Sequence, residues 1–335
     1  MKRLTIAFLI GGLALTAWLI IEVGAPMIGA ALSTAGWGGL LAICLFHLIA
    51  TALMGLAWWL LQRLGKLWVF IWGRLVRDAG SEVLPLSQIG GYVLGARAVI
   101  VHGVAGIAVA AATVVDATLE FTAQITYSTL GLMLFVWLSP SSAIASFVLA
   151  MLGVATLAAI ALIALQRRGS DLPARLAQRL SGSFLGRLFG STAAVQAEIT
   201  KLLRLERVWA SYLCHLGAWI VSGVEAWLAL WLMGASLSLP TVLAVESLVY
   251  ATRAMAFMVP NAIGVQEGAY IVLGGAFGLT PEFALSLSLL KRGRDFALGI
   301  PALASWQVWE GRKQWGTRNP LMLTIPSDPR AGKDG

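Results

Sequence analysis

A short polar interruption of an apolar sequence, at residues 258–270, is the first place where this chain could do chemistry. It reads MVPNAIGVQEGAY. Its helix-breaking and polar residues include Pro260, Asn261, Gly264, Glu267 and Gly268. Lipid offers no water to a broken backbone or a carboxylate, so such a break persists only where it is buried in protein or lines a polar cavity. The stretch therefore predicts a working site for polar matter at membrane depth.

A second interrupted stretch, at residues 84–95, echoes the first. It reads LPLSQIGGYVLG, and it shares a proline, a Gln-x-Gly step, a tyrosine and a Val-Leu-Gly with residues 259–274. Paired interrupted segments in two halves of a chain point to a transporter site at a repeat interface. We predict an internal repeat, with Glu82 and Pro85 at the first break and Pro260 at the second. Composition leaves open whether the repeat is inverted.

Ionisable residues also recur at helical spacing. Asp116, Glu120 and Gln124 are four residues apart, so on a helix they share one face, which we expect to line a cavity. Glu246 and Arg253 are seven apart and also share a face. They are expected either to neutralise each other as an ion pair or to serve as a gate or headgroup contact.

Cations interrupt the last apolar segment. Lys291, Arg292, Arg294 and Asp295 lie between apolar runs, and Arg97 holds an equivalent place after the first break. Such charges must face protein, water or an anion. A lipid phosphate would satisfy an arginine well, because the guanidinium can bind it with two parallel hydrogen bonds. The alternative is that these side chains extend to a membrane interface.

The composition sets the class of protein that must position these residues. Hydrophobic residues make up 59% of the chain and charged residues 12%, with a mean hydropathy of +0.82, whereas soluble domains carry about 25% charged residues. We predict an all-α polytopic membrane bundle of about eight spans plus broken or re-entrant segments. The net charge of +8 lies in a few short loops, which is typical of the cytoplasmic side of membrane proteins and not of nucleic-acid binding. The histidines and cysteines show no metal-ligand spacing, and no metal or cofactor is expected.

The expected elements follow from the apolar runs. Residues 25–36 are expected to form a loop, 62–80 an interfacial helix, and 81–97 a re-entrant or half-helix element. The expected spans are 4–23, 37–61, 98–115, 121–138, 143–165, 208–233, 239–259, 262–279 and 282–306. Because the basic loops should share one side, the region 81–166 must cross an even number of times. Either 81–97 continues across the membrane, or one of the three segments expected to span in that region is shorter than its expected range.

The expected organisation is one membrane domain, residues 1–310. Its halves, about 1–165 and 208–310, are joined by the basic segment 166–207, and a polar tail follows at 311–335. Both termini are predicted to be cytoplasmic, because the loops near 24–36, 139–142 and 234–240 carry no charge.

The sequence resembles the lysylphosphatidylglycerol synthase transmembrane-region family over roughly residues 4–305. The resemblance is carried by Glu82, Leu84, Pro85, Gly90, Gly91, Arg97, AATVVDATLE at 111–120 and VPNAIGVQEG at 259–268. Gly264-x-x-Glu267-Gly268 after a proline is its most specific part. Within the family the chain is most similar to hopanoid-biosynthesis-associated membrane proteins of the HpnL type. Asn261 and Ala262 stand where we would expect more glycine.

The resemblance implies a lipid-handling role. In two-domain synthases of this family the membrane part flips aminoacylated lipid, and a soluble domain, which this sequence does not show, transfers the aminoacyl group. We expect a translocator of hopanoids or related lipids in the bacterial cytoplasmic (inner) membrane, and not an enzyme. No Gly-x-x-x-x-Gly-Lys-Ser/Thr ATPase motif occurs. The expected headgroup path comprises Glu82, Pro85, Arg97, Asp116, Glu120, Gln124, Glu246, Arg253, Pro260, Asn261, Gly264, Glu267, Gly268, Arg292, Arg294 and Asp295.

Two other functions are compatible with these residues. An integral-membrane transferase could join a headgroup to a lipid, with Asp116 and Glu267 as base or metal ligands. A scaffold could hold other lipid-biosynthesis or transport proteins through the basic segment 166–207. Membrane lipids are the expected partners in the first two cases.

Overall fold

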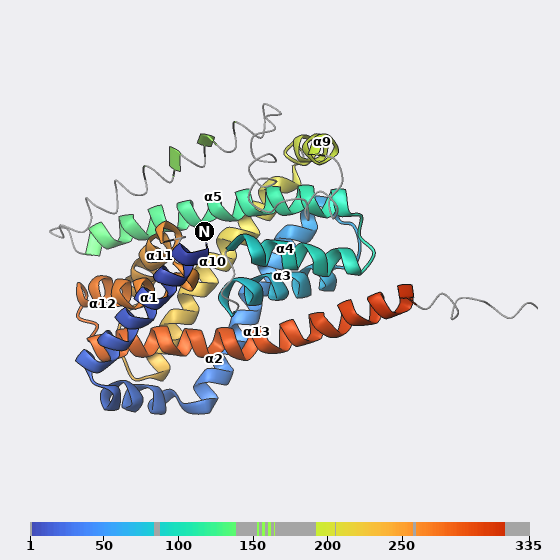
Figure 1. Ribbon diagram of the computed structural model, residues 1–335. Coiled ribbons are helices and arrows are strands. Elements are labelled where there is room, and N and C mark those ends of the chain that lie inside the picture. The colour runs from blue at the N-terminus through green and yellow to red at the C-terminus, as the bar shows by residue number, and fades with distance from the viewer. Residues whose placement is uncertain are drawn as a thin grey trace, which may run out of the picture.

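The structure is a computed structural model that describes residues 2–83, 88–138, 192–204, 206–256 and 259–318, with isolated positions between 153 and 164. Within these residues every regular element is a helix (Figure 1). Three of these helices are long and apolar enough to cross a membrane by length and composition: α2 (Ala25–Gln62), α5 (Gly106–Leu138) and α10 (Arg207–Leu232). The protein is therefore an all-α helical membrane bundle, as its composition predicts.

Helices α2 and α10 pack side by side in opposite directions. Gly39 of α2 approaches Leu232 near the end of α10, and Leu53 approaches Gly217 near its middle. This pairing fixes which ends of the two helices lie together. A loop was expected at 25–36, directly after α1 (Lys2–Val23). That segment is instead helical and forms the first part of α2. The only interruption is at Gly36, whose φ of 59° bends the helix.

Tryptophans mark both ends of this helix pair. Trp37 and Trp59 of α2 are 22 positions apart, as are Trp209 and Trp231 of α10, which corresponds to about 33 Å along a helix. Three of the four are strongly exposed, at 87% for Trp37, 71% for Trp209 and 61% for Trp231. A spacing near the ~30 Å thickness of a bilayer core, with exposed tryptophans at both limits, indicates where the membrane surfaces lie.

Helix α5 corrects the expected division of the middle of the chain. Residues 98–115 and 121–138 were expected to be two spans, but Gly106–Leu138 forms one continuous helix. Asp116 and Glu120 lie buried inside this helix and not in a connection. Apart from isolated positions between 153 and 164, the expected span 143–165 lies outside the described residues. Together with α5 it would give an even number of crossings, provided that the preceding segment turns back on itself.

The preceding segment does turn back. Helices α3 (Leu67–Glu82) and α4 (Gln88–Val101) form a tight antiparallel hairpin, and residues 84–87, including Pro85, lie outside the described part. A Cβ on Gly95 would stand 2.6 Å from Arg77 Cβ, and one on Gly91 would stand 2.5 Å from the Arg77 carbonyl oxygen. Glycine therefore allows a backbone approach that any side chain would prevent. The expected interfacial helix at 62–80 is thus wrong for α3, where Phe70 and Val76 are fully buried.

A second hairpin surrounds the C-terminal break. Helix α11 (Leu239–Met255) is followed by the 3-10 turn η1 (Pro260–Ala262) and by α12 (Val265–Gly275). Asn261 and Ala262 adopt left-handed φ angles of 50° and 46°, so non-glycine residues hold a conformation that favours glycine. With 17 and 11 residues, α11 and α12 are shorter than the ~20 residues needed to span. The expected broken segment is therefore a helical hairpin with a strained tip.

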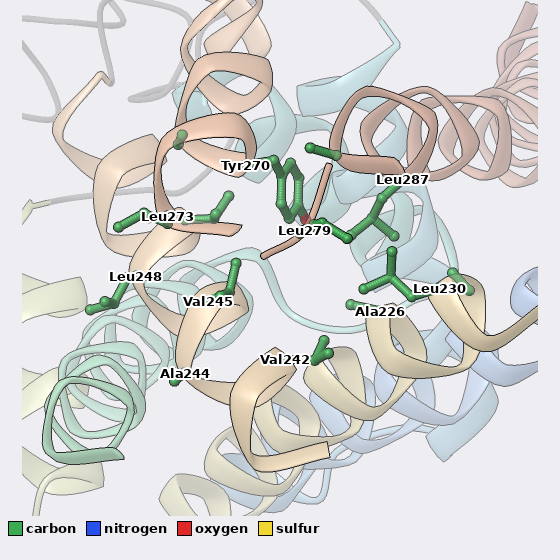
Figure 2. Close-up of a cluster of buried hydrophobic side chains, with 14 of the residues drawn as sticks. Ala226, Leu230, Val242, Ala244, Val245, Leu248, Tyr270, Leu273, Leu279 and Leu287 are labelled. Carbon is green, nitrogen blue, oxygen red and sulfur yellow. The ribbon is translucent and has the colours of Figure 1, made fainter. Parts of the chain in front are cut away.

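Helix α13 (Pro281–Arg318) packs against both hairpins and continues beyond the bundle (Figure 1). The main apolar core lies between α10, α11, α12 and α13 (Figure 2). Tyr270 from α12, Leu287 from α13 and Val245 of α11 are all members of this core. Helix α9 (Thr192–Leu202) packs Ile199 onto α5, and residues 166–191, residue 205 and the tail after 318 lie outside the described residues. The domain organisation expected from the sequence stays a prediction.

Candidate functional site

The first group of buried charges joins α3 to α5. Arg74 donates from Nη2 to Glu120 Oε1 at 2.9 Å and from Nε to Asp78 Oδ2 at 2.9 Å. Arg77 donates from Nη1 to Asp116 Oδ2 at 3.2 Å and from Nη2 to Glu120 Oε2. The side chains of Arg74, Arg77, Asp116 and Glu120 are at most 10% exposed. Because each arginine bonds two carboxylates, these contacts fix the hairpin against α5.

The same group reaches α10 and α4. His215 Nε2 lies 2.9 Å from Asp116 Oδ1, and both side chains are fully buried. The guanidinium of Arg77 stacks over the ring of Tyr92, 3.6 Å from its centroid. Four helices thus contribute to one buried polar group. We refer to Arg74, Arg77, Asp78, Asp116, Glu120 and His215 as the α3–α5 group.

A second group connects α10, α13 and α2. Arg294 of α13 donates from Nη1 to Glu225 Oε1 of α10 and from Nη2 to the neighbouring Asp295 Oδ1 at 2.6 Å. His47 Nδ1 of α2 lies 2.8 Å from Glu225 Oε2. The carboxylate of Glu225 is therefore bonded on both oxygens. Glu225, Arg294, Asp295 and His47 form the α10–α13 group.

Lys291 and Glu246 form a third buried pair, between α13 and α11. Lys291 Nζ donates to Glu246 Oε1 and lies 3.1 Å from the Tyr270 hydroxyl, which itself donates to Glu246 Oε2 at 2.6 Å. Tyr250, one turn from Glu246 on α11, shares a 2.7 Å hydrogen bond with Ser222 of α10. Glu246 is therefore paired with Lys291 and not with Arg253, which corrects the ion pair considered for residues seven apart.

Glu267 holds the start of α12 in place. Its Oε2 accepts from the Gly264 backbone N–H at 2.7 Å, and its Oε1 accepts from Ser288 Oγ and from Arg292 Nε, both at 2.8 Å. Gly264 has a φ of 82°, which favours glycine at this junction. The carboxylate is fully buried and bonded on both oxygens. Glu267 therefore caps the break and attaches it to α13.

The tips of the two hairpins meet. Arg253, in the last turn of α11, donates from Nη2 to Oε1 and Oε2 of Glu82, the last residue of α3, at 3.0 Å each. Asn261 Nδ2 donates to the Glu82 backbone oxygen at 2.8 Å, and Asn261 Oδ1 accepts from Arg253 at 3.2 Å. Segments about 170 positions apart in sequence thus share one polar junction. We refer to Glu82, Arg253 and Asn261 as the tip junction.

Comparison with known proteins identifies the family to which this charged helical bundle belongs. A family model for the lysylphosphatidylglycerol synthase TM region matches residues 4–302. The chain belongs to this family. No curated protein and no solved structure matches it. Membership in the lysylphosphatidylglycerol synthase TM region family indicates a membrane lipid-related function, in agreement with a charged interior enclosed by apolar helices.

Other residues expected in the path of this family member are not among the members of these groups. Arg97 donates from Nη2 to Glu310 Oε1 at 2.7 Å, and its side chain is 32% exposed. Gln124 Nε2 donates to the Tyr250 backbone oxygen at 3.1 Å. Beside Gly268, a Cβ would meet no heavy atom within 4 Å. Pro260 opens η1, and Pro85 lies outside the described residues.

Among the group members that the expected path left out, Arg74 and Arg77 are the two that the sequence analysis placed at the membrane surface. They were assigned to an interfacial helix because they lie in a segment with other basic residues. The glycines at 73, 80, 91 and 95 are the signal that could have corrected this, because small residues at helical spacing indicate close helix packing within a membrane bundle. In the described part of the chain, no group of three or more His, Cys, Asp or Glu side chains is arranged to hold a metal ion.

Proposed function

We propose that this protein moves the polar headgroup of a membrane lipid across the bilayer while the acyl part stays in the surrounding lipid. The tip junction is the observation that carries this proposal. It brings two interrupted hairpins together at charged residues, which is the arrangement expected of a transporter site at the interface of two halves. Charges at this depth are retained where they serve a passage for polar matter.

The donors near the second break favour an anionic part in the headgroup. Arg292 uses Nε for Glu267, while its Nη2 is buried without a hydrogen-bond partner among the described residues. Its side chain is 14% exposed, so a small displacement would open it to a ligand. A guanidinium with a free N–H suits a phosphate oxygen. Arg292 is therefore the residue that we assign to headgroup contact.

The resemblance to hopanoid-associated members of the family makes a hopanoid or a related lipid the first class of substrate to test. On this proposal the protein acts without covalent chemistry, in a bacterial cytoplasmic membrane, with both termini cytoplasmic. Other lipid-biosynthesis or transport proteins would deliver or remove the lipid. A headgroup transferase would instead produce a new covalent lipid when purified protein is incubated with labelled lipid and donor.

The proposal can be tested with the full chain in vesicles of phosphatidylethanolamine and phosphatidylglycerol that carry a fluorescent phosphatidylglycerol or a fluorescent hopanoid. Quenching of the outer leaflet by dithionite measures how fast label crosses. We expect the protein to accelerate crossing of at least one probe, and R292Q to slow it at least about tenfold, which corresponds to 1.4 kcal/mol in the barrier. K201Q, which removes one partner of the exposed Lys201–Glu198 pair, is the matched control. Equal rates with and without protein for both probes would reject lipid movement.

A further inference from the structure

The balance of charge differs between the buried groups. Arg253 with Glu82, Lys291 with Glu246, and Arg292 with Glu267 each match one cation to one carboxylate. The α3–α5 group and the α10–α13 group do not. Among the described residues, each of these two groups holds one carboxylate more than its arginines can neutralise. The side chains of Asp78 and Asp295 are 28% and 15% exposed, so water meets part of this excess negative charge, and one further positive charge in each group would neutralise the rest.

A histidine lies in each of the two unbalanced groups and in none of the balanced ones. His215 is bonded to Asp116 in the α3–α5 group, and His47 is bonded to Glu225 in the α10–α13 group. An imidazole that takes up a proton supplies the single positive charge that is missing. Histidine is also the side chain whose ordinary proton affinity allows it to gain and lose that proton near neutral pH.

The hydrogen bonds show which nitrogen would receive the proton. An ionised carboxylate only accepts, so His215 carries hydrogen on Nε2 and His47 carries hydrogen on Nδ1. The free atoms are then His215 Nδ1 and His47 Nε2. His215 Nδ1 is buried and has no partner in the described part of the chain, and neither has Ser211 Oγ one helical turn earlier.

The two histidine–carboxylate pairs lie at different depths. Glu225 is ten positions after His215 on α10, which is about 15 Å along the helix. His215 is six positions from Trp209, and Glu225 is six positions from Trp231. Each pair is therefore about 9 Å inside one of the two tryptophan-marked surfaces. Between them on α10 lies Ser222, hydrogen-bonded to Tyr250.

Charged groups from the neighbouring helices surround both imidazoles. His215 faces Asp116 and Glu120 of α5, with Arg74 and Arg77 of α3 behind them. His47 faces Glu225 of α10, and Arg294, Asp295 and Lys291 of α13 lie on the far side of that carboxylate. Cys44, one turn away on α2, is also near this group. In both places the bonded partner is negative and the cations are already held by carboxylates.

We propose that His215 and His47 are two proton-binding sites, one near each membrane surface, and that this protein exchanges protons as it moves lipid. With both sites protonated, the two groups are neutral. Release of either proton leaves one negative charge at that depth, which a proton from the other surface or a cationic ligand can neutralise. The coupling to lipid rests on the proposed function, whereas proton binding at the two imidazoles does not.

The chain contains only three histidines, which makes a direct test possible. Full-length protein labelled with 15N-histidine in lipid nanodiscs should give three imidazole signals, assigned by H47Q, H102Q and H215Q. We expect His47 and His215, which are bonded to carboxylates of the two unbalanced groups, to carry hydrogen on both nitrogens. His102, whose Nδ1 is 2.9 Å from the Ala98 carbonyl and whose ring is surrounded by Trp68, Trp72 and Trp309, is the internal control. Singly protonated rings at both His47 and His215 would overturn the proposal.

Carboxamide variants separate the charge argument from general disruption. D116N removes one carboxylate and with it the excess negative charge of the α3–α5 group, so His215 alone should lose its second hydrogen, and E225Q should do the same to His47 alone. If D116N and E225Q leave both signals unchanged, the excess carboxylates do not hold the protons and the proposal fails. If all three signals shift together, the variant has disturbed the fold. D116E and E225D, which keep the carboxylate charge and should keep the second hydrogen, then decide the question.

A pH gradient imposed across the lipid vesicles described above tests the coupling. We expect the gradient to shift the steady-state leaflet distribution of the label at least about twofold. Label that moves with the protein but ignores the gradient would reject coupling. If no label moves, the proposed function fails, while the nitrogen signals still decide whether the two histidines bind protons.

Discussion

Arg253 Nη2 lies 3.0 Å from both carboxylate oxygens of Glu82, so one guanidinium nitrogen joins the end of α11 to the end of α3. The contact is flanked by the Asn261 amide, which donates to the Glu82 backbone. The tip of each hairpin is therefore bonded to a residue at the tip of the other. Neither tip can be displaced without breaking a charged contact in the opposite half of the chain.

We predict that E82Q and R253Q each lower the free energy of unfolding by about 2 kcal/mol, because each leaves a partly buried charge without its partner. The double variant should lose less than the sum of the two losses, because both residues act through one contact. Equilibrium unfolding in mixed micelles measures all three. Additive losses would contradict a direct interaction. K201Q, at an exposed pair, should change stability by less than about 0.5 kcal/mol.

The α3–α4 hairpin predicts a steric effect at Gly95. A Cβ there would stand 2.6 Å from Arg77 Cβ and 2.8 Å from the Gly73 carbonyl oxygen. We expect G95A to destabilise the protein by about 2 kcal/mol through overpacking. G217A, where the new Cβ would lie 3.8 Å from Leu53, should be neutral or stabilise α10 by up to about 1 kcal/mol. Thermal unfolding of the two variants side by side would contradict this prediction if it ranked them in the opposite order.

Replacement of Arg77 by lysine keeps the positive charge and removes the planar guanidinium group. Arg77 bonds Asp116 and Glu120 with different nitrogens and stacks on Tyr92. A lysine ammonium cannot reproduce that planar fork, so we expect R77K to destabilise the protein by about 3 kcal/mol. R63K, outside the buried groups, should change stability by less than about 0.5 kcal/mol. Equal unfolding midpoints for R77K and wild type would show that charge alone is sufficient.

Two glycines of the second break should respond differently to alanine. Gly264 has a φ of 82° and a ψ of −39°, so G264A should destabilise the protein by about 1–3 kcal/mol. Gly268 lies within α12 beside open space, and G268A should be neutral or slightly stabilising. If lipid passes along this face of α12, G268L should slow label crossing while the unfolding midpoint stays within experimental error. A fall in both together would show that the space beside Gly268 is needed for folding instead.

The breaks could be predicted from sequence, whereas the charge pairing could not. The prolines and glycines that interrupt the apolar runs can be read directly from the sequence, and both expected breaks lie between the two helices of a hairpin. Arg253 has acidic neighbours in sequence only at Glu246, seven positions away, but its partner Glu82 is 171 positions away. Local spacing favours Glu246 and gives no sign that Glu82 is the partner. The choice is made by the packing of α3 against the tip of α11.

The same limitation explains the errors at α3 and α5. Asp116 and Glu120 make a continuous helix look like two spans joined by a polar connection, because an isolated carboxylate is costly in lipid. Their cost is offset by Arg77 and Arg74, which were themselves assigned to the membrane surface. The two errors therefore have one cause. The burial of each set of charges is explained only by the opposite charges of the other set.

The paired tryptophans of α2 and α10 have a consequence for the kind of lipid environment that suits this protein. Both helices place indole rings 22 positions apart, and the buried ionic groups occupy fixed levels between them. A thinner bilayer of short-chain lipids would draw its headgroups toward those levels, and a thicker one would bury the indoles in hydrocarbon. Acyl-chain length is therefore a physical variable to which the protein should be sensitive, independently of which headgroup it recognises.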